Sequence, residues 1–153
     1  MKKTVVTTSE AETRTLARRL AAGLKGGDVV CLRGPLGSGK TRFVQGLAAG
    51  LGFKGRVTSP TFTLVREYQG KKLRLYHLDL FRVAGADLRL VGLDDYFNDP
   101  KGVCAIEWPE AGGKSLPARR LDVRIESISE QERRITLEGK IPLSLKRRGQ
   151  GED

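Results

Sequence analysis

Two stretches near the amino end of the chain repeat their hydrophobic positions at helical spacing. In the first, leucine and alanine return to one face of a helix at Leu16, Ala17, Leu20, Ala21 and Leu24. Ser9 and Glu12 have the spacing of a capping box, with Glu12 reaching back to the Ser9 amide, and Gly26-Gly27 end the helix. In the second stretch, residues 43–51 carry apolar residues at helical spacing, and Gly52 ends this helix. We predict two amphipathic helices here.

Strands are predicted where apolar residues run continuously or alternate with polar ones. Asp28–Arg33 and Val103–Glu107 are short continuous runs, which is typical of strands buried on both faces. Alternating segments predict two hairpins, 61–68 with 72–79 and 121–125 with 135–137, and 86–97 predicts one or two short helical turns. Because hairpins interrupt the alternation of strand and helix, we predict a three-layer α/β domain with a mixed parallel and antiparallel sheet.

The composition is that of a single globular domain. The chain has 153 residues, of which 39% are hydrophobic and 30% charged, enough for one core. No run reaches the roughly 18 apolar residues of a membrane helix. The amino end lacks the apolar segment of a signal peptide, so we expect a cytoplasmic protein without a membrane partner. We predict a folded domain over 1–140 and a polar, loosely ordered tail over 141–153.

The formal net charge of +10 raises the question of nucleic-acid binding. Basic residues are spread along the chain, with one compact run at Lys146-Arg147-Arg148, and no aromatic-interleaved RNA-binding motif occurs. A solvated basic surface and contact with RNA or an acidic protein both remain open. The two cysteines, Cys31 and Cys104, lie inside apolar runs, so we expect them to be buried and reduced.

The segment Gly34–Thr41 matches the pattern G-x-x-x-x-G-K-[ST] at every fixed position. Gly37 and Gly39 allow the backbone to turn its amides towards phosphate oxygens, and the following helix presents its positive end to the same anion. Lys40 is placed to reach the β- and γ-phosphates, and the Thr41 hydroxyl to bind magnesium. An apolar strand before the loop and an amphipathic helix after it support a P-loop NTPase-like domain. The predicted phosphate-binding residues are Gly34, Gly37, Ser38, Gly39, Lys40, Thr41 and Arg42.

Nucleotide hydrolysis also needs an acid near the metal and a group that positions water. Asp79 and Glu107 each end a predicted strand, where ligands of open α/β sheets bind, so we assign catalysis to them together with Lys40. By the period of two, His77 shares a strand face with Asp79, and we interpret it as a packed residue beside the site. Trp108 either lines the site or anchors a loop.

Three further strings accompany the P-loop: Thr58-Ser59-Pro60-Thr61-Phe62, His77-Leu78-Asp79-Leu80-Phe81-Arg82 and Ile106-Glu107-Trp108-Pro109-Glu110. With them the chain resembles the bacterial TsaE (YjeE) family over roughly residues 5 to 140. These are the ATPase components of the machinery that makes threonylcarbamoyladenosine in tRNA. The resemblance implies ATP and Mg²⁺ as cofactors, slow ATP hydrolysis, and association with the TsaD and TsaB proteins. It leaves a direct contact with tRNA open.

By position, the resemblance also implies roles for single residues. Thr41 and Glu107 match metal-site residues, and Asp79 matches a Walker-B-like acid. Thr61 falls in a switch-like loop near the γ-phosphate, and Glu10 matches a nucleotide-contacting position. The chain departs from the family at Phe81, where tyrosine is usual, and at Arg89, which interrupts an acidic helix face, and we expect neither to touch the phosphate site.

Three alternatives compete with an ATPase of this family. A small-molecule P-loop kinase needs an arginine-bearing lid, for which Gly112–Arg120 with Arg119 and Arg120 offers the only room. A GTPase is disfavoured because no N-K-x-D string occurs. A nucleotide-gated binding module overlaps with the family function, since a slow ATPase can act chiefly as a switch.

Overall fold

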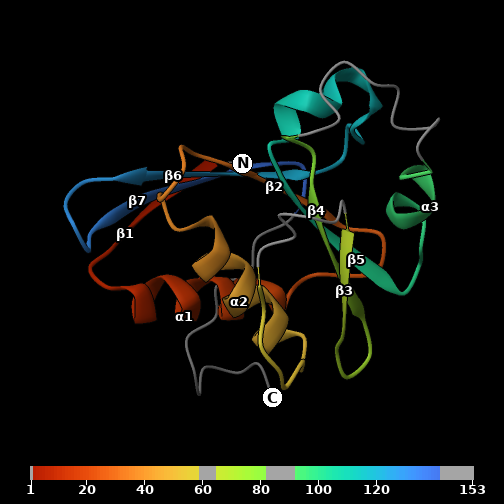
Figure 1. The fold of residues 1–153 in the computed structure, drawn as a ribbon, viewed down its shortest axis with the longest axis horizontal. Coiled ribbons are helices and arrows are strands. Elements are labelled where there is room, and N and C mark those ends of the chain that lie inside the picture. Colours follow the sequence, from red (N-terminus) through yellow and green to blue (C-terminus); the bar gives the residue numbers. More distant parts are fainter. Residues whose placement is uncertain (1, 59–64, 82–91, 142–153) are drawn as a thin grey trace.

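The computed structural model describes residues 2–58, 65–81 and 92–141 (Figure 1). In chain order the elements are β1 (Lys2–Thr7), α1 (Glu10–Ala21), β2 (Val29–Arg33), α2 (Lys40–Gly50), β3 (Val65–Gln69), β4 (Arg74–Asp79), α3 (Asp94–Phe97), β5 (Gly102–Glu107), the 3₁₀ helix η2 (Pro109–Ser115), β6 (Leu121–Ser127) and β7 (Arg133–Gly139).

The strands form one seven-stranded sheet in the order β1-β7-β6-β2-β5-β4-β3. The four central strands β6, β2, β5 and β4 run parallel to one another. Antiparallel pairs flank them, β6 with β7 and β7 with β1 on one side, and β4 with β3 on the other. The predicted mixed sheet and both predicted hairpins are confirmed. Since the central strands are parallel, β2, β4 and β5 all end at the same edge of the sheet.

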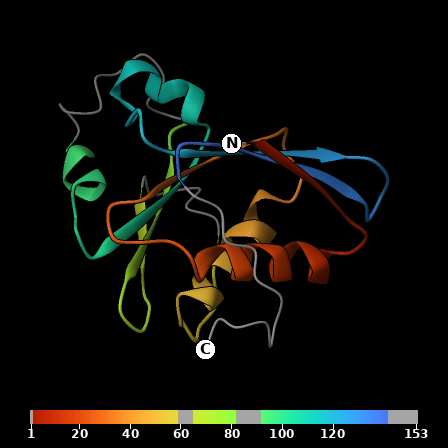
Figure 2. The ribbon, with the colours of Figure 1, turned by 180° about the vertical axis from the view of Figure 1, so that it is seen from behind.

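Two apolar cores lie on the two faces of this sheet. Helices α1 and α2 cover one face together, as the views from front and back show (Figures 1 and 2). Leu20 from α1 and Phe43 and Leu47 from α2 are buried there. On the other face, Phe97 of α3 and Leu116 after η2 pack over strand residues of a second core. The three predicted layers are therefore present in the described part of the chain.

Glycines let the two helices approach each other closely. A Cβ at Gly46 of α2 would overlap the carbonyl oxygen of Arg14 in α1, and one at Gly50 would lie 2.6 Å from the carbonyl oxygen of Arg18. The backbones therefore touch where larger residues would separate them. This contact places the first turn of α1 beside the first turn of α2, next to the P-loop.

The helix caps and one loop differ from the predictions. Ser9 Oγ accepts the Glu12 amide at 3.1 Å, as predicted, but the Glu12 carboxylate accepts from the amide and hydroxyl of Thr8 instead of the Ser9 amide. These bonds, the amide first, hold the pKa of Glu12 below its ordinary value. The predicted Gly112-Gly113 loop lies within η2, where Gly113 has the non-helical angles φ +50° and ψ −126°, so the glycines form a kink between two helical turns and not a longer loop.

One strand was missed, and some predictions cannot be compared. The edge strand β1 was not predicted, although Thr4 to Thr7 is a run of β-branched residues. Ile141, the first residue of the predicted tail, is 2% exposed and packs in the core beneath α1 and α2. The predictions for 61–64, 86–91 and 142–153 lie outside the described residues.

Candidate functional site

The P-loop joins β2 to α2 at the edge where the parallel strands end. Gly37 and Gly39 have φ angles of +82° and +109°, in the left-handed region that favours glycine. A Cβ at Gly37 would meet no heavy atom within 4 Å, so the loop is open on that side. Gly39 caps α2, whose first free amides point out of the helix end. The loop therefore combines backbone donors and a positive helix end, as phosphate binding requires.

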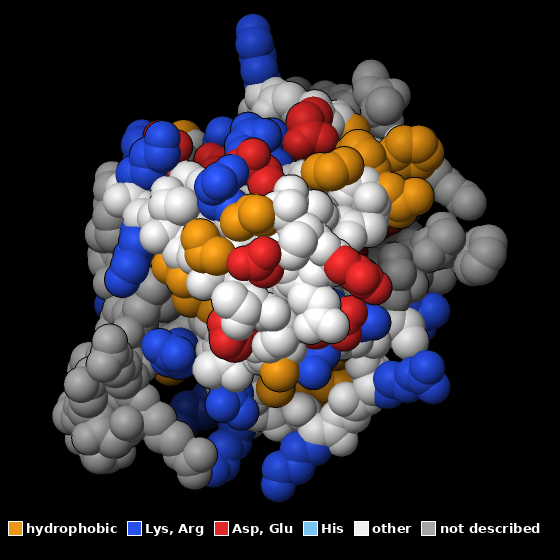
Figure 3. All heavy atoms as spheres, turned by 90° about the vertical axis from the view of Figure 1, so that its left-hand side faces the viewer, with side chains coloured by type: hydrophobic (Ala, Val, Ile, Leu, Met, Phe, Trp, Pro, Cys, Tyr) orange, Lys and Arg blue, Asp and Glu red, His pale blue; other side chains and the backbone are white. Residues whose placement is uncertain are grey.

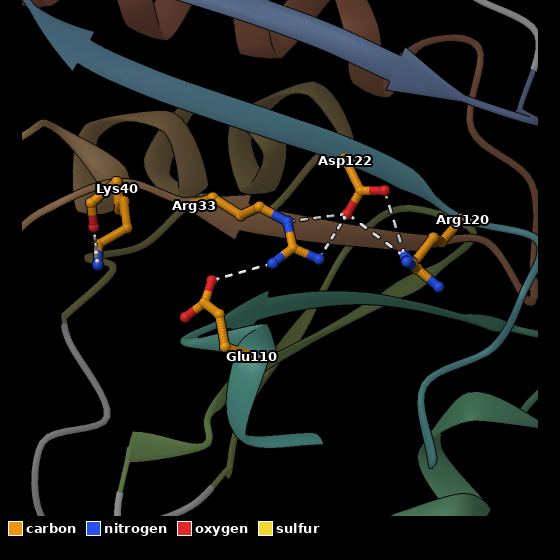
Figure 4. Close-up of polar contacts among 6 residues, drawn as sticks. Arg33, Lys40, Glu110, Arg120 and Asp122 are labelled. Carbon is orange, nitrogen blue, oxygen red and sulfur yellow. Dashed lines mark hydrogen bonds and ion pairs between the residues drawn. The ribbon is translucent and has the colours of Figure 1, made fainter. Parts of the chain in front are cut away.

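Lys40 lies over this loop and is 6% exposed. Its Nζ donates to the carbonyl oxygen of Gly34 at 2.9 Å (Figure 4). The same nitrogen lies 4.1 Å from the centre of the Trp108 ring, within the range of a cation–π contact. The ammonium group is thus held at the loop by one hydrogen bond and one aromatic face.

Trp108 lines the site, which settles the two alternatives left open by the sequence. It follows Glu107 directly and has φ +56°, so its backbone is left-handed without being glycine. Such a conformation is strained and persists where surrounding contacts impose it. The Phe81 ring, 62% exposed, lies 5.2 Å from the Trp108 ring between centroids. Phe81 is therefore separated from Lys40 only by the Trp108 ring, which is closer to the predicted phosphate site than expected. Arg89 lies outside the described residues.

The two predicted acids stand side by side. Asp79 and Glu107 are paired in register at the ends of the parallel strands β4 and β5. Glu107 is 5% exposed, and one oxygen of Asp79 accepts the Phe81 amide at 3.0 Å. Residues two positions earlier in each strand, His77 and Ala105, are also buried, and Ala105 lies in the core under α1 and α2. Both carboxylates thus belong to the sheet face that carries the P-loop helix.

The predicted residues at the start of the helices also meet. Arg42 Nε, in the first turn of α2, donates to Glu10 Oε2 of α1 at 3.1 Å, and the same oxygen lies 3.9 Å from Arg14. The Glu10 side chain is 62% exposed, so this pair is open to solvent. Thr41 follows Lys40 at the start of α2 and is partly exposed. Thr61 lies outside the described residues.

Sequence reasoning missed Arg133, the first residue of β7. Its Nε donates to the carbonyl oxygen of Ser38 at 2.8 Å, across 95 residues of sequence. The same guanidinium donates to carbonyl oxygens in the 129–132 turn. The Ser38 hydroxyl is buried and has no hydrogen-bond partner among the described residues. Arg133 therefore fixes the middle of the P-loop to β7, which lies two strands from β2 in the sheet, and no local pattern signals such a contact.

A charged network lies on the other side of β2 (Figure 4). Arg33, the residue before the P-loop, donates to Asp122 at 3.1 and 3.2 Å and to Glu110 of η2 at 3.1 Å. Arg120 also bonds Asp122 and donates to the Pro117 carbonyl oxygen. The network ties the strand before the P-loop to the helix after Trp108. Arg120, one of the two arginines predicted for a kinase lid, belongs to this network through its bonds to Asp122 and Pro117.

The residues at the site suit a small, hard cation and a phosphate. The Thr41 hydroxyl and the carboxylates of Asp79 and Glu107 are oxygen donors, which Mg²⁺ prefers. Among the residues that the structure describes, no group of three or more His, Cys, Asp or Glu is close enough to hold a metal alone.

Two further features limit the chemistry of the site. Burial is the main cause that raises the pKa of Cys31 and of Cys104 to about 12, so neither thiol is a nucleophile at neutral pH.

Figure 3 shows the left-hand side of Figure 1, where the chain passes from β2 to α2. Acidic side chains dot the middle of this face, and Lys and Arg gather towards its border. The basic excess of the chain is therefore not concentrated at the centre of this face.

The chain is similar to a known group of proteins over most of its length. The family model described as "Threonylcarbamoyl adenosine biosynthesis protein TsaE" matches residues 7–135. The tRNA threonylcarbamoyladenosine biosynthesis protein TsaE of Bacillus subtilis is 44% identical over 130 residues, covering 85% of this chain and 81% of the relative. The protein of the same name from Aquifex aeolicus is 41% identical over 138 residues, covering 88% and 95%. The crystal structure of Bacillus subtilis YdiB matches with a TM-score of 0.79 at 38% identity, covering 91% of this chain and 86% of that one.

Proposed function

The chain belongs to the TsaE family of threonylcarbamoyladenosine biosynthesis proteins, and on that premise we propose that it is a Mg²⁺-dependent ATPase acting in this modification of tRNA. The observation that carries the ATPase is the placement of the P-loop, Asp79 and Glu107 at one edge of the sheet. Of the two arginines that a kinase lid could use, Arg120 is engaged with Asp122 and Pro117, whereas Arg119 is exposed. No observation favours the kinase over the ATPase.

In the proposed reaction, backbone amides of the P-loop and the start of α2 bind the phosphates. Lys40 then exchanges its bond to the Gly34 carbonyl oxygen for one to a phosphate oxygen. Bound Mg²⁺ supplies charge neutralisation at the phosphates. Thr41 and Asp79 would hold the ion. Glu107, buried beside Trp108, would hold the metal or orient the attacking water, and its low-dielectric setting would strengthen either interaction.

Single-turnover hydrolysis and Mg²⁺-dependent ATP titration test this assignment. Glu107→Ala should cripple hydrolysis and leave ATP affinity within about tenfold, on the order of 1.4 kcal/mol. Asp79→Ala should also lose hydrolysis and should raise the Mg²⁺ concentration needed for nucleotide binding. Normal hydrolysis by Glu107→Ala would show that the catalytic acid lies elsewhere.

The partners of this ATPase are proposed from its family. We expect it to associate with the TsaB and TsaD proteins in a nucleotide-dependent manner, as a cytoplasmic protein. Among the described residues, no helix is long and apolar enough to cross a membrane. A pull-down of the TsaB–TsaD pair, with ATP, with ADP and without nucleotide, tests the association. Recovery that is absent in all three conditions would contradict it.

A further inference from the structure

His77 is the one histidine of the chain, and it is buried completely. It lies on β4 two residues before Asp79, on the same face of the strand. Its Nε2 lies 2.5 Å from Glu107 Oε2, and Glu107 is itself 5% exposed. In the described part of the chain, the other ring nitrogen, Nδ1, has no hydrogen-bond partner.

This arrangement is costly if packing is its only purpose. On this face Leu75, two residues before His77, and Ala105, its partner on β5, are buried and apolar. The partner of His77 on β3 is the exposed Arg66, and Asp79 follows two residues later on β4. An aliphatic residue would fill such a position without leaving a buried nitrogen unpaired. The imidazole does one thing that an aliphatic residue does not, which is to hydrogen-bond the carboxylate of Glu107.

We propose that His77 is a positioning residue that donates Nε2–H to Glu107 and thereby aims the second carboxylate oxygen at the reaction site. This inference rests on the proposed function. A glutamate side chain has three torsions, and one fixed oxygen restricts where the other lies. Carboxylates at metal sites are usually held in this way by a second residue. The hydrogen of this bond lies on Nε2, because an ionised carboxylate oxygen accepts hydrogen bonds and does not donate them.

Two substitutions of matched chemistry separate positioning from packing. The amide of glutamine reaches the place of Nε2, whereas the amide of asparagine stops at the place of Nδ1. His77→Gln should therefore retain most of the hydrolysis rate, and His77→Asn should lose about 10- to 100-fold in the single-turnover rate. The apparent affinity for ATP should stay close to that of the parent protein in both. Thermal unfolding identifies any variant that is not folded.

The nucleotide-free protein offers a readout that is independent of hydrolysis. With a single histidine, the ring ¹⁵N spectrum at neutral pH contains one imidazole. We expect a hydrogen on Nε2 and a marked change of the Nε2–H proton shift in Glu107→Gln. This measurement needs no folded His77 variant.

The outcomes distinguish this inference from the proposed function. An Nε2 without hydrogen, or an Nε2–H signal that does not change in Glu107→Gln, would overturn the positioning role. Equal loss of hydrolysis in folded His77→Gln and His77→Asn would overturn it as well, because the loss would then come from changed packing and not from the missing hydrogen bond. Failure of the parent protein to hydrolyse ATP, with the expected imidazole spectrum, would instead contradict the ATPase and leave the bond between His77 and Glu107 supported.

Discussion

Replacing Arg133 should loosen the P-loop from a distance. Its Nε holds the Ser38 carbonyl oxygen at 2.8 Å, and its Nη1 donates to the carbonyl oxygens of Ser129 and Glu132, both at 2.9 Å. Since Nη1 carries two hydrogens, the guanidinium makes three good bonds at a time. Each contributes about 1 kcal/mol when partly exposed to solvent. Arg133→Ala should therefore lower the free energy of unfolding by about 2–3 kcal/mol.

Only one of these bonds reaches the nucleotide-binding loop. Its loss should weaken ATP binding by about tenfold, or roughly 1.4 kcal/mol. Arg133→Lys keeps the charge without the forked geometry and should behave like Arg133→Ala in binding. Arg134→Ala is the matched control, because Arg134 is the next residue of β7, exposed, and without a side-chain hydrogen bond or ion pair among the described residues.

Calorimetric titration with a non-hydrolysable ATP analogue and urea unfolding of the same samples measure the two effects. The structural reasoning predicts a loss in both for Arg133→Ala and in neither for Arg134→Ala. Parent-like ATP affinity in an Arg133→Ala protein of lower stability would refute it. The arginine would then hold only the 129–132 turn.

Four further outcomes are expected. Lys40→Ala should abolish tight ATP binding in a folded protein, measured by calorimetry, because it removes the cation that meets the β- and γ-phosphates. In competition binding, ATP should be preferred over GTP, since no guanine-reading N-K-x-D string is present. Because burial raises the pKa of Cys31 and Cys104 to about 12, the folded thiols keep protons that the unfolded ones lose above pH 9. Stability in urea should then fall as pH rises above 9, by about 1.4 kcal/mol per unit for each thiol, and the fall should be smaller in a Cys31→Ala/Cys104→Ala variant. If the basic surface contacts tRNA, binding to tRNA should weaken steeply with salt and further after truncation at Leu145, whereas no binding at low salt would leave the charge a solvated surface.

Local patterns were sufficient for most of the fold. Most of these predictions depend on patterns among neighbouring residues, which can be read directly from the sequence. Examples are the capping serine, the helical repeat of apolar residues through 43–51 and the continuous apolar runs. The strand β1 was not predicted because its residues neither form a continuous apolar run nor alternate between apolar and polar, with two lysines first and Val5 and Val6 side by side. The second bond of Glu12 went to Thr8 instead of Ser9 because two donors of Thr8 lie within reach.

The site was predictable where a motif or a strand end marks it. A motif marks Lys40 and strand ends mark Asp79 and Glu107, and the parallel register of β4 and β5 explains why the two acids meet. Arg133 was not predicted, because its bond to Ser38 depends on how β7 is placed against the P-loop. The same holds for the pair of Glu10 and Arg42, which meet because α1 and α2 touch at Gly46 and Gly50.

The stacking of Lys40 on Trp108 gives the protein an optical reporter of its own. Trp108 is the single tryptophan of the chain, so its emission is the tryptophan fluorescence of the whole molecule. If phosphate binds at the P-loop as proposed, it should draw the Lys40 ammonium group away from the indole ring and change the electric field at the fluorophore. Loading of the site should then be measurable in unlabelled protein, on the timescale of a stopped-flow experiment and at the residue that contacts Lys40.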